Sequence, residues 1–300
     1  MSLRIVEPGP LALIEDLGRP GLAAIGVSAS GALDRAALRL GNRLLGNDEG
    51  CAGIEFLLGG ATVRFEEPAW FAVTGAVVSL DLDGRPVDPH DAVHAEAGAT
   101  LRIGRPTAGV RSYLTVRGGV DVHPVLGSRS RDVLSALGPA PLTAGDVLAV
   151  GEHPAQAVPL LDFVPVALPA DGVVEVRAHR GPRADWFLPS AIDAFYDREW
   201  EVSAESNRIG ARLDPVRAAA HRAGSEPHPS PVLERAVLSE LPSEPMVAGA
   251  VQVSPDGRPT VLLADHPVTG GYPVIAVVAD ASLDAFAQLR PGQRLAFRHA

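Results

Sequence analysis

Leu-Leu-Ala-Asp-His-Pro-Val-Thr-Gly-Gly-Tyr-Pro, residues Leu262–Pro273, is the stretch from which the fold can be worked out. The apolar run Thr260–Ala264 leads into it, and a second apolar run, Val274–Ala279, follows it. Runs of this length and composition predict two strands joined by a loop. Because functional groups often lie on loops held by rigid strands, the acid, imidazole and hydroxyl of this loop indicate a candidate site. The alternative is an ordinary hairpin loop, since Gly and Asp are common turn residues.

The same alternation of apolar runs and turn signals continues outward through most of the chain. Asp-Gly and Gly-Gly pairs mark turns at residues 83–84, 118–119, 256–257 and 270–271. Further strands are expected at Ala69–Val73, Ser112–Val116 and Val173–Val176. Helices are expected over Asp34–Leu45, Ala184–Tyr196 and Ser282–Leu289, with the second broken at Pro189. The Gly270–Gly271 pair predicts positive φ or a close backbone approach.

Weak internal repeats predict two barrel-like halves. Asp-Gly-Arg-Pro occurs at residues 83–86 and again at 256–259, and a Gly-x-x-Leu-x-apolar turn-and-strand occurs three times, at 98–103, 145–150 and 292–297. Closed barrels would hide the edges that many short strands create. The Pro- and Ala-rich stretch Glu152–Asp171 is the linker candidate. We therefore expect one part over residues 1–165 and a second over 166–300, with the option that the subdomains interleave.

Composition excludes several classes of function. The chain has 300 residues and a net charge of −10, which argues against binding to nucleic acid or to an anionic membrane surface. All 26 basic residues are arginine, so Schiff-base and P-loop lysine chemistry are both excluded. The only cysteine, Cys51, is expected to be buried and inert, and it rules out a disulfide framework. No signal peptide or apolar run of about 18 residues is present, which predicts a cytoplasmic protein.

The N-terminal half holds a second candidate site. Acids, an arginine and two serines gather in Glu15–Gly21 and Gly26–Asp34, directly before a predicted helix. The N–H groups at such a helix start can hold an anion. The alternatives are that Asp34 only caps the helix, and that Asp16 and Arg19 form a local ion pair.

Other motifs are weaker. His90-Asp91-Ala92-Val93-His94 has the spacing of a two-histidine metal helix, but Pro89 and the flanking strand signals disfavour a helix there, so we expect no metal site. Walker-type and dinucleotide glycine loops are absent from the sequence, and so is a Gly-x-Ser-x-Gly elbow.

Taken together in chain order, these segments resemble the family of the 5-oxoprolinase C subunit, also called the biotin-dependent carboxyltransferase-like family. That family includes the second subunit of allophanate hydrolase and part of the carboxyltransferase region of urea carboxylase. The matching motifs are Glu15–Gly21, Ser30–Arg35, Gly118–Val122, Val125–Ser130, Ser206–Gly210, Gly249–Val253, Pro255–Gly257, Ala264–Asp265 and Thr269–Pro273.

The resemblance implies a mainly β fold with a few helices, built from two cyclophilin-like β-barrel subdomains. It also implies companion B and A subunits of 5-oxoprolinase, with which the chain would open 5-oxoproline to glutamate at the expense of ATP. The alternatives are a urea carboxylase or allophanate hydrolase component, or a non-catalytic protein that regulates its companion. The first alternative needs biotin on another protein, because this chain has no lysine to carry it.

Lactam opening requires an acid or base, oxyanion donors and a group that binds the substrate's negative charge. We expect Asp265 or His266 to serve as the acid or base, and Thr269 with the Gly270 and Gly271 N–H groups to hold the oxyanion or phosphate. Arg208 and Arg19 are expected to bind carboxylate or phosphate. The rest of the predicted substrate- and anion-binding set is Asp16, Ser30, Asp34 and Tyr272. A solvated loop histidine is the alternative for His266, and a structural turn arginine for Arg208.

Two positions depart from the family pattern. Arg183 stands where relatives often have Gln, and Val274 stands where many have a basic residue. If that basic residue binds an anion in relatives, either an arginine elsewhere replaces it here or this chain lacks that step.

Overall fold

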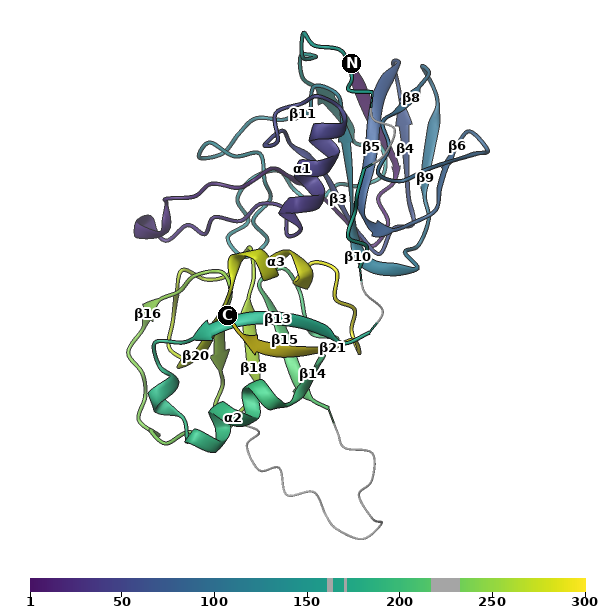
Figure 1. Ribbon diagram of the computed structural model, residues 1–300. Coiled ribbons are helices and arrows are strands. Elements are labelled where there is room, and N and C mark those ends of the chain that lie inside the picture. Colours follow the sequence, from purple (N-terminus) through teal and green to yellow (C-terminus); the bar gives the residue numbers. More distant parts are fainter. Residues whose placement is uncertain (161–163, 170–171, 217–232) are drawn as a thin grey trace. The chain divides into compact units, whose positions relative to one another are not determined.

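The computed structural model describes residues 1–160, 164–169, 172–216 and 233–300 (Figure 1). Two compact units are present: unit 1 comprises Met1–Leu22 and Ala29–Ala170, and unit 2 comprises Ala23–Ser28 and Asp171–Ala300. The units therefore interleave in sequence near the N-terminus. Part of the expected linker, residues 161–163 and 170–171, lies outside the described residues.

Unit 1 is built from two antiparallel sheets. The first has the strand order β11 (Val120–Asp121), β12 (Val147–Val150), β1 (Ser2–Glu7), β4 (Ala61–Phe65), β9 (Thr100–Ile103), β6 (Leu80–Leu82) and β7 (Arg85–Val87). The second has the order β2 (Leu11–Glu15), β3 (Gly53–Leu57), β10 (Ala108–Val116), β5 (Ala69–Val77) and β8 (Val93–Ala95).

The core of unit 1 lies between these sheets. Leu3 and Ile5 of β1, Phe65 of β4 and Phe71 of β5 belong to one buried cluster. The rings of Phe65 and Phe71, one from each sheet, have centroids 5.0 Å apart. Burial of such apolar area is the main source of stability for stacked sheets.

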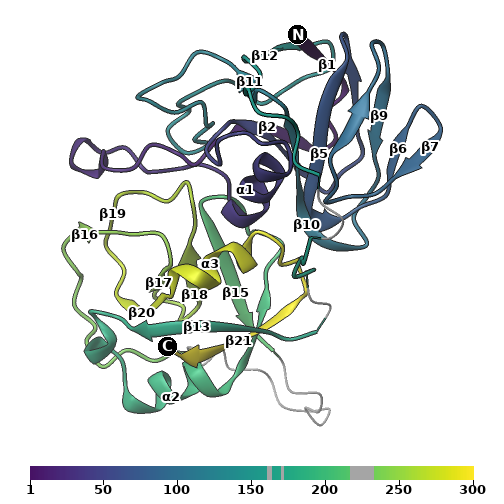
Figure 2. The same ribbon diagram turned by 45° about the horizontal axis from the view of Figure 1, so that its top comes forward.

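Helix α1 (Arg35–Leu44) covers β5 and β10, which confirms the predicted helix Asp34–Leu45 (Figure 2). The Asp34 carboxylate accepts a hydrogen bond from the Ala37 N–H at 2.9 Å, as expected of an N-cap. Helix and sheet approach closely at Gly41, where an added Cβ would lie 2.6 Å from the Thr115 hydroxyl oxygen. Because α1 covers one face and the core the other, β10 is buried along almost its whole length.

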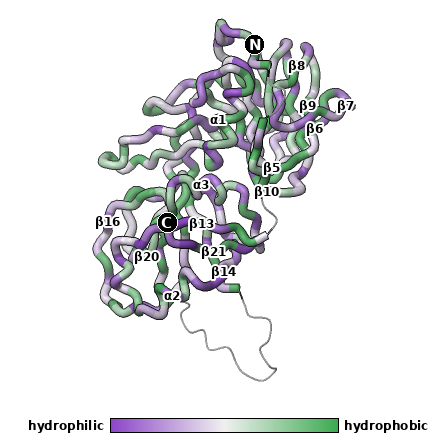
Figure 3. The backbone as a smooth tube through the Cα atoms, viewed as in Figure 1, coloured by the Kyte–Doolittle hydropathy of each residue, from purple (hydrophilic) through white to green (hydrophobic). Residues whose placement is uncertain are grey.

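Unit 2 is a closed barrel in the order β13 (Val174–Arg180), β20 (Val274–Val278), β17 (Ala250–Val253), β18 (Pro259–Leu262), β15 (Gly210–Pro215), β14 (Glu199–Val202) and β21 (Arg294–His299). Strands β13 and β21 are parallel and close the ring, and the other pairs are antiparallel. Unlike β10, β13 alternates buried and exposed residues. Hydrophilic segments, drawn in purple in Figure 3, lie along β13.

The remaining elements of unit 2 are η1 (Ala23–Ile25), η2 (Ala184–Trp186), α2 (Pro189–Asp197), β16 (Glu244–Pro245), β19 (Thr269–Gly270) and α3 (Asp280–Phe286). The predicted break at Pro189 is confirmed, because η2 ends before it and α2 begins on it. Helix α2 packs against the barrel through Phe195, which stacks on Phe297 of β21 with centroids 4.3 Å apart.

The prediction of a mainly β chain with few helices is confirmed, and unit 2 is a barrel. Each of the predicted strands named above overlaps an observed one. Within the described ranges, every helix is too short or too polar to cross a bilayer.

Candidate functional site

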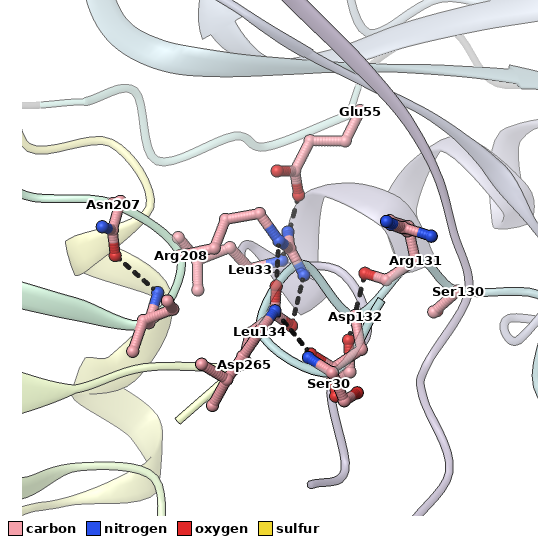
Figure 4. Close-up of polar contacts among 12 residues, drawn as sticks. Ser30, Leu33, Glu55, Ser130, Arg131, Asp132, Leu134, Asn207, Arg208 and Asp265 are labelled. Atoms are coloured by element: carbon pink, nitrogen blue, oxygen red, sulfur yellow. Dashed lines mark hydrogen bonds and ion pairs between the residues drawn. The ribbon is translucent and has the colours of Figure 1, made fainter. Parts of the chain in front are cut away.

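The loop after β18 is fixed by a buried ion pair. The Asp265 carboxylate accepts two hydrogen bonds from the Arg208 guanidinium, from Nε to Oδ2 at 2.8 Å and from Nη2 to Oδ1 at 3.2 Å (Figure 4). The side chain of Asp265 is 0% exposed and that of Arg208 is 3% exposed. Backbone hydrogen bonds from Asp265 N to Arg208 O and from Leu263 N to Ile209 O join the same two segments. The Asn207 side chain in turn accepts from Ile209 N at 2.8 Å. Arg208 therefore contacts an internal carboxylate, and its predicted role toward a substrate anion stays a prediction.

His266 is buried, so it is not the solvated loop histidine that the sequence left as an alternative. Its Nδ1 lies 2.9 Å from the carbonyl oxygen of Pro267. A carbonyl only accepts, so Nδ1 is the donor in this contact. A histidine ring with its single proton on Nδ1 has Nε2 as its acceptor. This is the tautomer that a general base requires at Nε2.

In the Gly270–Gly271 pair, Gly270 allows a neighbouring side chain to pack closely against the backbone. Neither Gly270 nor Gly271 has positive φ, which corrects that part of the expectation. An added Cβ at Gly270 would lie 2.5 Å from Gln252 Nε2, and Gly270 pairs with Glu244 in the small β16–β19 ladder. The exposed Thr269 belongs to the same ladder, and Tyr272 beyond it is 47% exposed.

In unit 1, Asp16 is the centre of a buried hydrogen-bond network. Its carboxylate accepts from the hydroxyls of Ser128 (2.7 Å) and Ser130 (2.6 Å) and from the backbone N–H groups of Gly18 (2.7 Å) and Arg129 (2.6 Å). These donors tie the loop after β2 to the loop at residues 128–130. Asp16 therefore has a structural role whatever else it does.

Arg19 forms no ion pair with Asp16 in the described part of the chain, so the local-pair alternative is wrong. Its guanidinium donates to the backbone carbonyls of Val125 (3.3 Å) and Ser130. The side chain is buried, and its Nη1 has no hydrogen-bond partner among the described residues. A buried cation with an unused donor fits the predicted anion-binding role.

Asp34 does more than cap α1. Its N–H donates to the Tyr113 hydroxyl at 2.8 Å, and that hydroxyl donates to Glu55 Oε2 at 2.7 Å. Arg111 Nε lies 3.3 Å from Glu55 Oε1, and all four residues are buried. Burial raises the pKa of Tyr113 well above its ordinary value of 10.0, and the nearby charges of Glu55 and Asp34 raise it further. Ser30, at φ 53°, donates to the Arg131 carbonyl at 3.2 Å.

Sequence reasoning missed Glu55, Tyr113, Ser128 and Ser130 as parts of these clusters. Glu55 and Tyr113 lie inside strands β3 and β10, where local pattern marks them only as strand residues. A buried acid in an otherwise apolar strand was the one available signal for Glu55.

The predicted site residues fall into two sets. Asp16, Arg19, Ser30 and Asp34 belong to unit 1, whereas the remaining seven, from Arg208 to Tyr272, belong to unit 2. That both sets serve one site stays a prediction.

The weaker sequence motifs have local explanations. His90 lies in a turn at φ 62° and His94 lies on β8, so the two do not share a helix. Cys51 is only half-buried, and its burial raises the pKa of the thiol. Arg183 forms an ion pair with Glu244.

A groove of about 580 Å³ crosses the outer face of the barrel in unit 2. Side chains from three neighbouring strands form its floor in register: Arg212 of β15 pairs with Thr260 of β18, and Thr260 pairs with Gln252 of β17. Tyr272 lies beside Gln252, whose Nε2 donates to the Tyr272 carbonyl at 3.3 Å.

A second cross-strand group in the groove is an ion network. Arg258 Nη1 lies 3.2 Å from Asp214 Oδ1, and Arg258 Nε lies 3.5 Å from Asp256 Oδ2. Hydrogen bonds from Ser254 and from the Arg258 backbone lower the pKa of Asp256, against the opposing effect of its partial burial.

Comparison with known proteins identifies the family of the chain. The family model of the carboxyltransferase domain, subdomains A and B, matches residues 25–299. The chain is 36% identical to the C subunit of 5-oxoprolinase from Escherichia coli over 98% of its own length and 90% of that protein. It is 32% identical to urea amidolyase of Saccharomyces cerevisiae over 99% of its own length and 16% of that protein.

A structural comparison supports the same family. The crystal structure of the K. lactis urea amidolyase superposes with a TM-score of 0.86 at 29% identity, over 99% of this chain and 18% of that chain. The chain therefore belongs to the carboxyltransferase domain family, subdomains A and B, together with the C subunits of 5-oxoprolinase.

Proposed function

We propose that the chain is a subunit of an ATP-dependent 5-oxoprolinase, which opens 5-oxoproline to glutamate together with companion B and A subunits. The observation that carries this proposal is the 36% identity to the 5-oxoprolinase C subunit over nearly all of both chains. That relative is one subunit of an enzyme, so we expect turnover only from the assembled complex.

Of the two acid/base candidates, the geometry favours His266. Asp265 is held by Arg208 through two nitrogens, which suits a positioning role. The Nδ1 of His266 donates to the Pro267 carbonyl, and in the ring form with one proton Nε2 takes a proton from the attacking water. The proton then passes to the lactam nitrogen as the C–N bond breaks, so the ring nitrogen becomes the amine of glutamate.

Arg19 is the residue of unit 1 that fits an anion. Its Nη1, which has no hydrogen-bond partner in the part of the chain that the structure describes, can donate to one oxygen of a carboxylate or phosphate. The other guanidinium contacts hold the side chain in place. ATP, when bound to the complex, supplies the free energy that lactam opening requires. Phosphate-binding lysines are excluded because the chain contains none, which leaves arginines and backbone N–H groups for that task.

The test is reconstitution with the B and A subunits, followed by measurement of ATP-dependent glutamate release from 5-oxoproline. The variant His266→Gln should lower kcat by about 100-fold or more, as expected for loss of a general base. Arg19→Gln should raise KM or lower kcat, whereas the control Arg294→Gln, which changes an exposed barrel arginine paired with Glu199, should leave both constants unchanged. Near-normal turnover by His266→Gln would exclude it as the base, and no turnover by the wild-type complex would overturn the proposed function.

Urea chemistry is the second candidate function. It is favoured by the TM-score of 0.86 to the K. lactis urea amidolyase. The corresponding assay supplies urea and a carboxylated biotin carrier on a separate protein, since this chain has no lysine for biotin. Carboxyl transfer without glutamate release would favour this function. Tight binding to the companion with neither activity would favour a regulatory protein.

A further inference from the structure

A long loop of unit 1 joins β11 to β12. Its residues 122–146, all of which the structure describes, contain neither a helix nor an extended strand. Loops of this length without secondary structure are uncommon in compact domains and usually have a function. One part of the loop is a two-residue hairpin turn, Leu126–Gly127. Val125 N donates to Ser128 O at 2.8 Å across this turn, and Ser128 N donates to Val125 O at 3.2 Å.

Leu126 has a backbone conformation that is unfavourable for a leucine. Its φ is 53° and that of Gly127 is 82°, as in a type I′ turn. Positive φ brings the Cβ of an L-residue close to the following carbonyl oxygen, so Asn, Asp and Gly are the usual residues there. The side chain adds little to the core, because Leu126 is 50% exposed. A strained residue that the fold does not need points to a function.

Residues of the predicted unit 1 site hold this turn in place. Arg19 donates from Nε to Val125 O at 3.3 Å and from Nη2 to Ser130 O. The Asp16 carboxylate accepts a hydrogen bond from the Ser128 hydroxyl at 2.7 Å. The leucine is therefore preorganised, and a partner could bury it without first ordering the loop.

Leu58 shows that strain and exposure alone do not identify a docking residue. Its φ is 58°, it is 43% exposed and it also precedes a glycine. Leu58 follows the C-terminal end of β3, whereas Asp16, which holds the Leu126 turn, follows the C-terminal end of the antiparallel β2. These ends lie about 14 Å apart along the strands. What distinguishes Leu126 is the hydrogen bonding of its turn to Arg19 and Asp16.

We propose that Leu126 docks into an apolar pocket of the companion B subunit. The inference rests on the proposed function, which requires such a partner. Because the turn is bonded to Arg19, the partner contacts unit 1 beside the residue proposed to bind the anion. A second copy of the chain is a poorer occupant, since both copies carry a net charge of −10. The exposed neighbours His123, Pro124 and Gly127 carry no carboxylate, so the rim of the pocket can be neutral or acidic.

The test measures binding of the full chain to the purified B subunit by calorimetry. Leu126→Asn should weaken binding about tenfold, because burial of a leucine is lost and an amide is desolvated. Since asparagine adopts positive φ readily, the same variant should keep or raise Tm. Leu126→Met, which keeps an apolar side chain of similar size, should bind like the wild type. Leu58→Asn makes the same change at the other exposed leucine with positive φ, and as the matched control it should leave the affinity unchanged.

Weaker binding together with an unchanged or higher Tm supports docking, because damage to the fold would lower both. The inference is overturned if Leu126→Asn binds the B subunit as tightly as the wild type, or if Leu58→Asn weakens binding equally. Self-association of the wild type that Leu126→Asn abolishes would also overturn it, since the leucine would then belong to an interface between two copies.

Glutamate release by the assembled complex judges the proposed function separately. Binding that depends on Leu126 but gives no turnover would reject the function alone. Binding and turnover that Leu126→Asn leaves intact would reject the docking role alone. Absence of any binding between the wild type and the B subunit would overturn both.

Discussion

Asp16 of unit 1 and Asp265 of unit 2 both belong to sequence motifs, and both are buried. The two carboxylates have different kinds of hydrogen-bonding partner. Asp16 accepts four hydrogen bonds, two from serine hydroxyls and two from backbone N–H groups. Asp265 receives a guanidinium in a bidentate ion pair. Removing the charge of Asp16 weakens the hydrogen bonds that neutral donors make to it. Removing the charge of Asp265, in contrast, takes a carboxylate away from a buried cation.

The comparison shows that mutating motif residues of the same type can destabilise the protein to different extents. A loss of activity in an Asp265 variant can come from damage to the loop, because Arg208 is buried with it. An Asp16 variant leaves only neutral donors without their full partner, which costs less than taking a charged partner from a buried guanidinium. Stability measurements therefore have to accompany the activity assays at both positions.

The largest effect is expected for Asp265→Asn. It removes a charged partner of the buried Arg208 side chain, which is 3% exposed, and should lower the free energy of unfolding of unit 2 by about 3–5 kcal/mol. Denaturation followed through the buried Trp200 measures this. The double variant Arg208→Met/Asp265→Leu should be more stable than the single one, and an equally large loss in the double variant would contradict the ion-pair account.

A smaller effect is expected for Asp16→Asn. One carboxylate oxygen becomes an NH₂ group that faces hydrogen-bond donors, which should cost about 1–3 kcal/mol in unit 1. Ser128→Ala removes one donor and should cost about 1 kcal/mol. Fluorescence of Trp70 in unit 1 reports both. If Asp16→Asn destabilised the protein as strongly as Asp265→Asn, the contrast between the two aspartates would be lost.

The effect expected for Tyr113→Phe is also small, and it depends on pH. At pH 8 the loss of the hydroxyl between Asp34 and Glu55 should cost about 1–2 kcal/mol. Burial raises the pKa of Tyr113, so above about pH 10 the unfolded chain loses this proton and the folded chain keeps it. The wild type then loses stability with rising pH and the variant has no such loss.

The stability gap between wild type and Tyr113→Phe should therefore narrow from pH 8 to pH 11. Paired denaturation curves at these two pH values measure the gap. A gap that stays constant would mean that Tyr113 titrates near its ordinary pKa in the folded chain.

Local pattern was sufficient where a feature depends on neighbours in sequence. The leucines of α1 and the following Gly46 predict a helix, and Pro189 predicts a break, because both act through the backbone within one or two turns. The glycine pair shows the limit. Sequence could indicate that position 270 needs a glycine, but the reason is the Gln252 side chain on another strand.

The candidate site could be predicted only as a set of residue types. The sequence indicated Asp265 and Arg208 as separate functional groups, and their mutual ion pair arises from a contact between segments 57 positions apart. Arg19 was expected to pair with the nearby Asp16 or to bind an anion. Hydroxyls from the loop at residues 128–130 satisfy Asp16, which removes the first alternative, and the second stays a prediction.

By itself, the sequence determined the family, the predominance of strands, the positions of the helices and the exclusion of lysine chemistry, because each of these follows from local pattern or from composition. Only the tertiary structure decided which polar groups are already satisfied and which remain available. Hydrogen bonds and ion pairs are short-range, and strand register brings together side chains that are distant in sequence. That is why Asp265 is a partner of Arg208, and why Arg212, Thr260 and Gln252 form one row on the barrel.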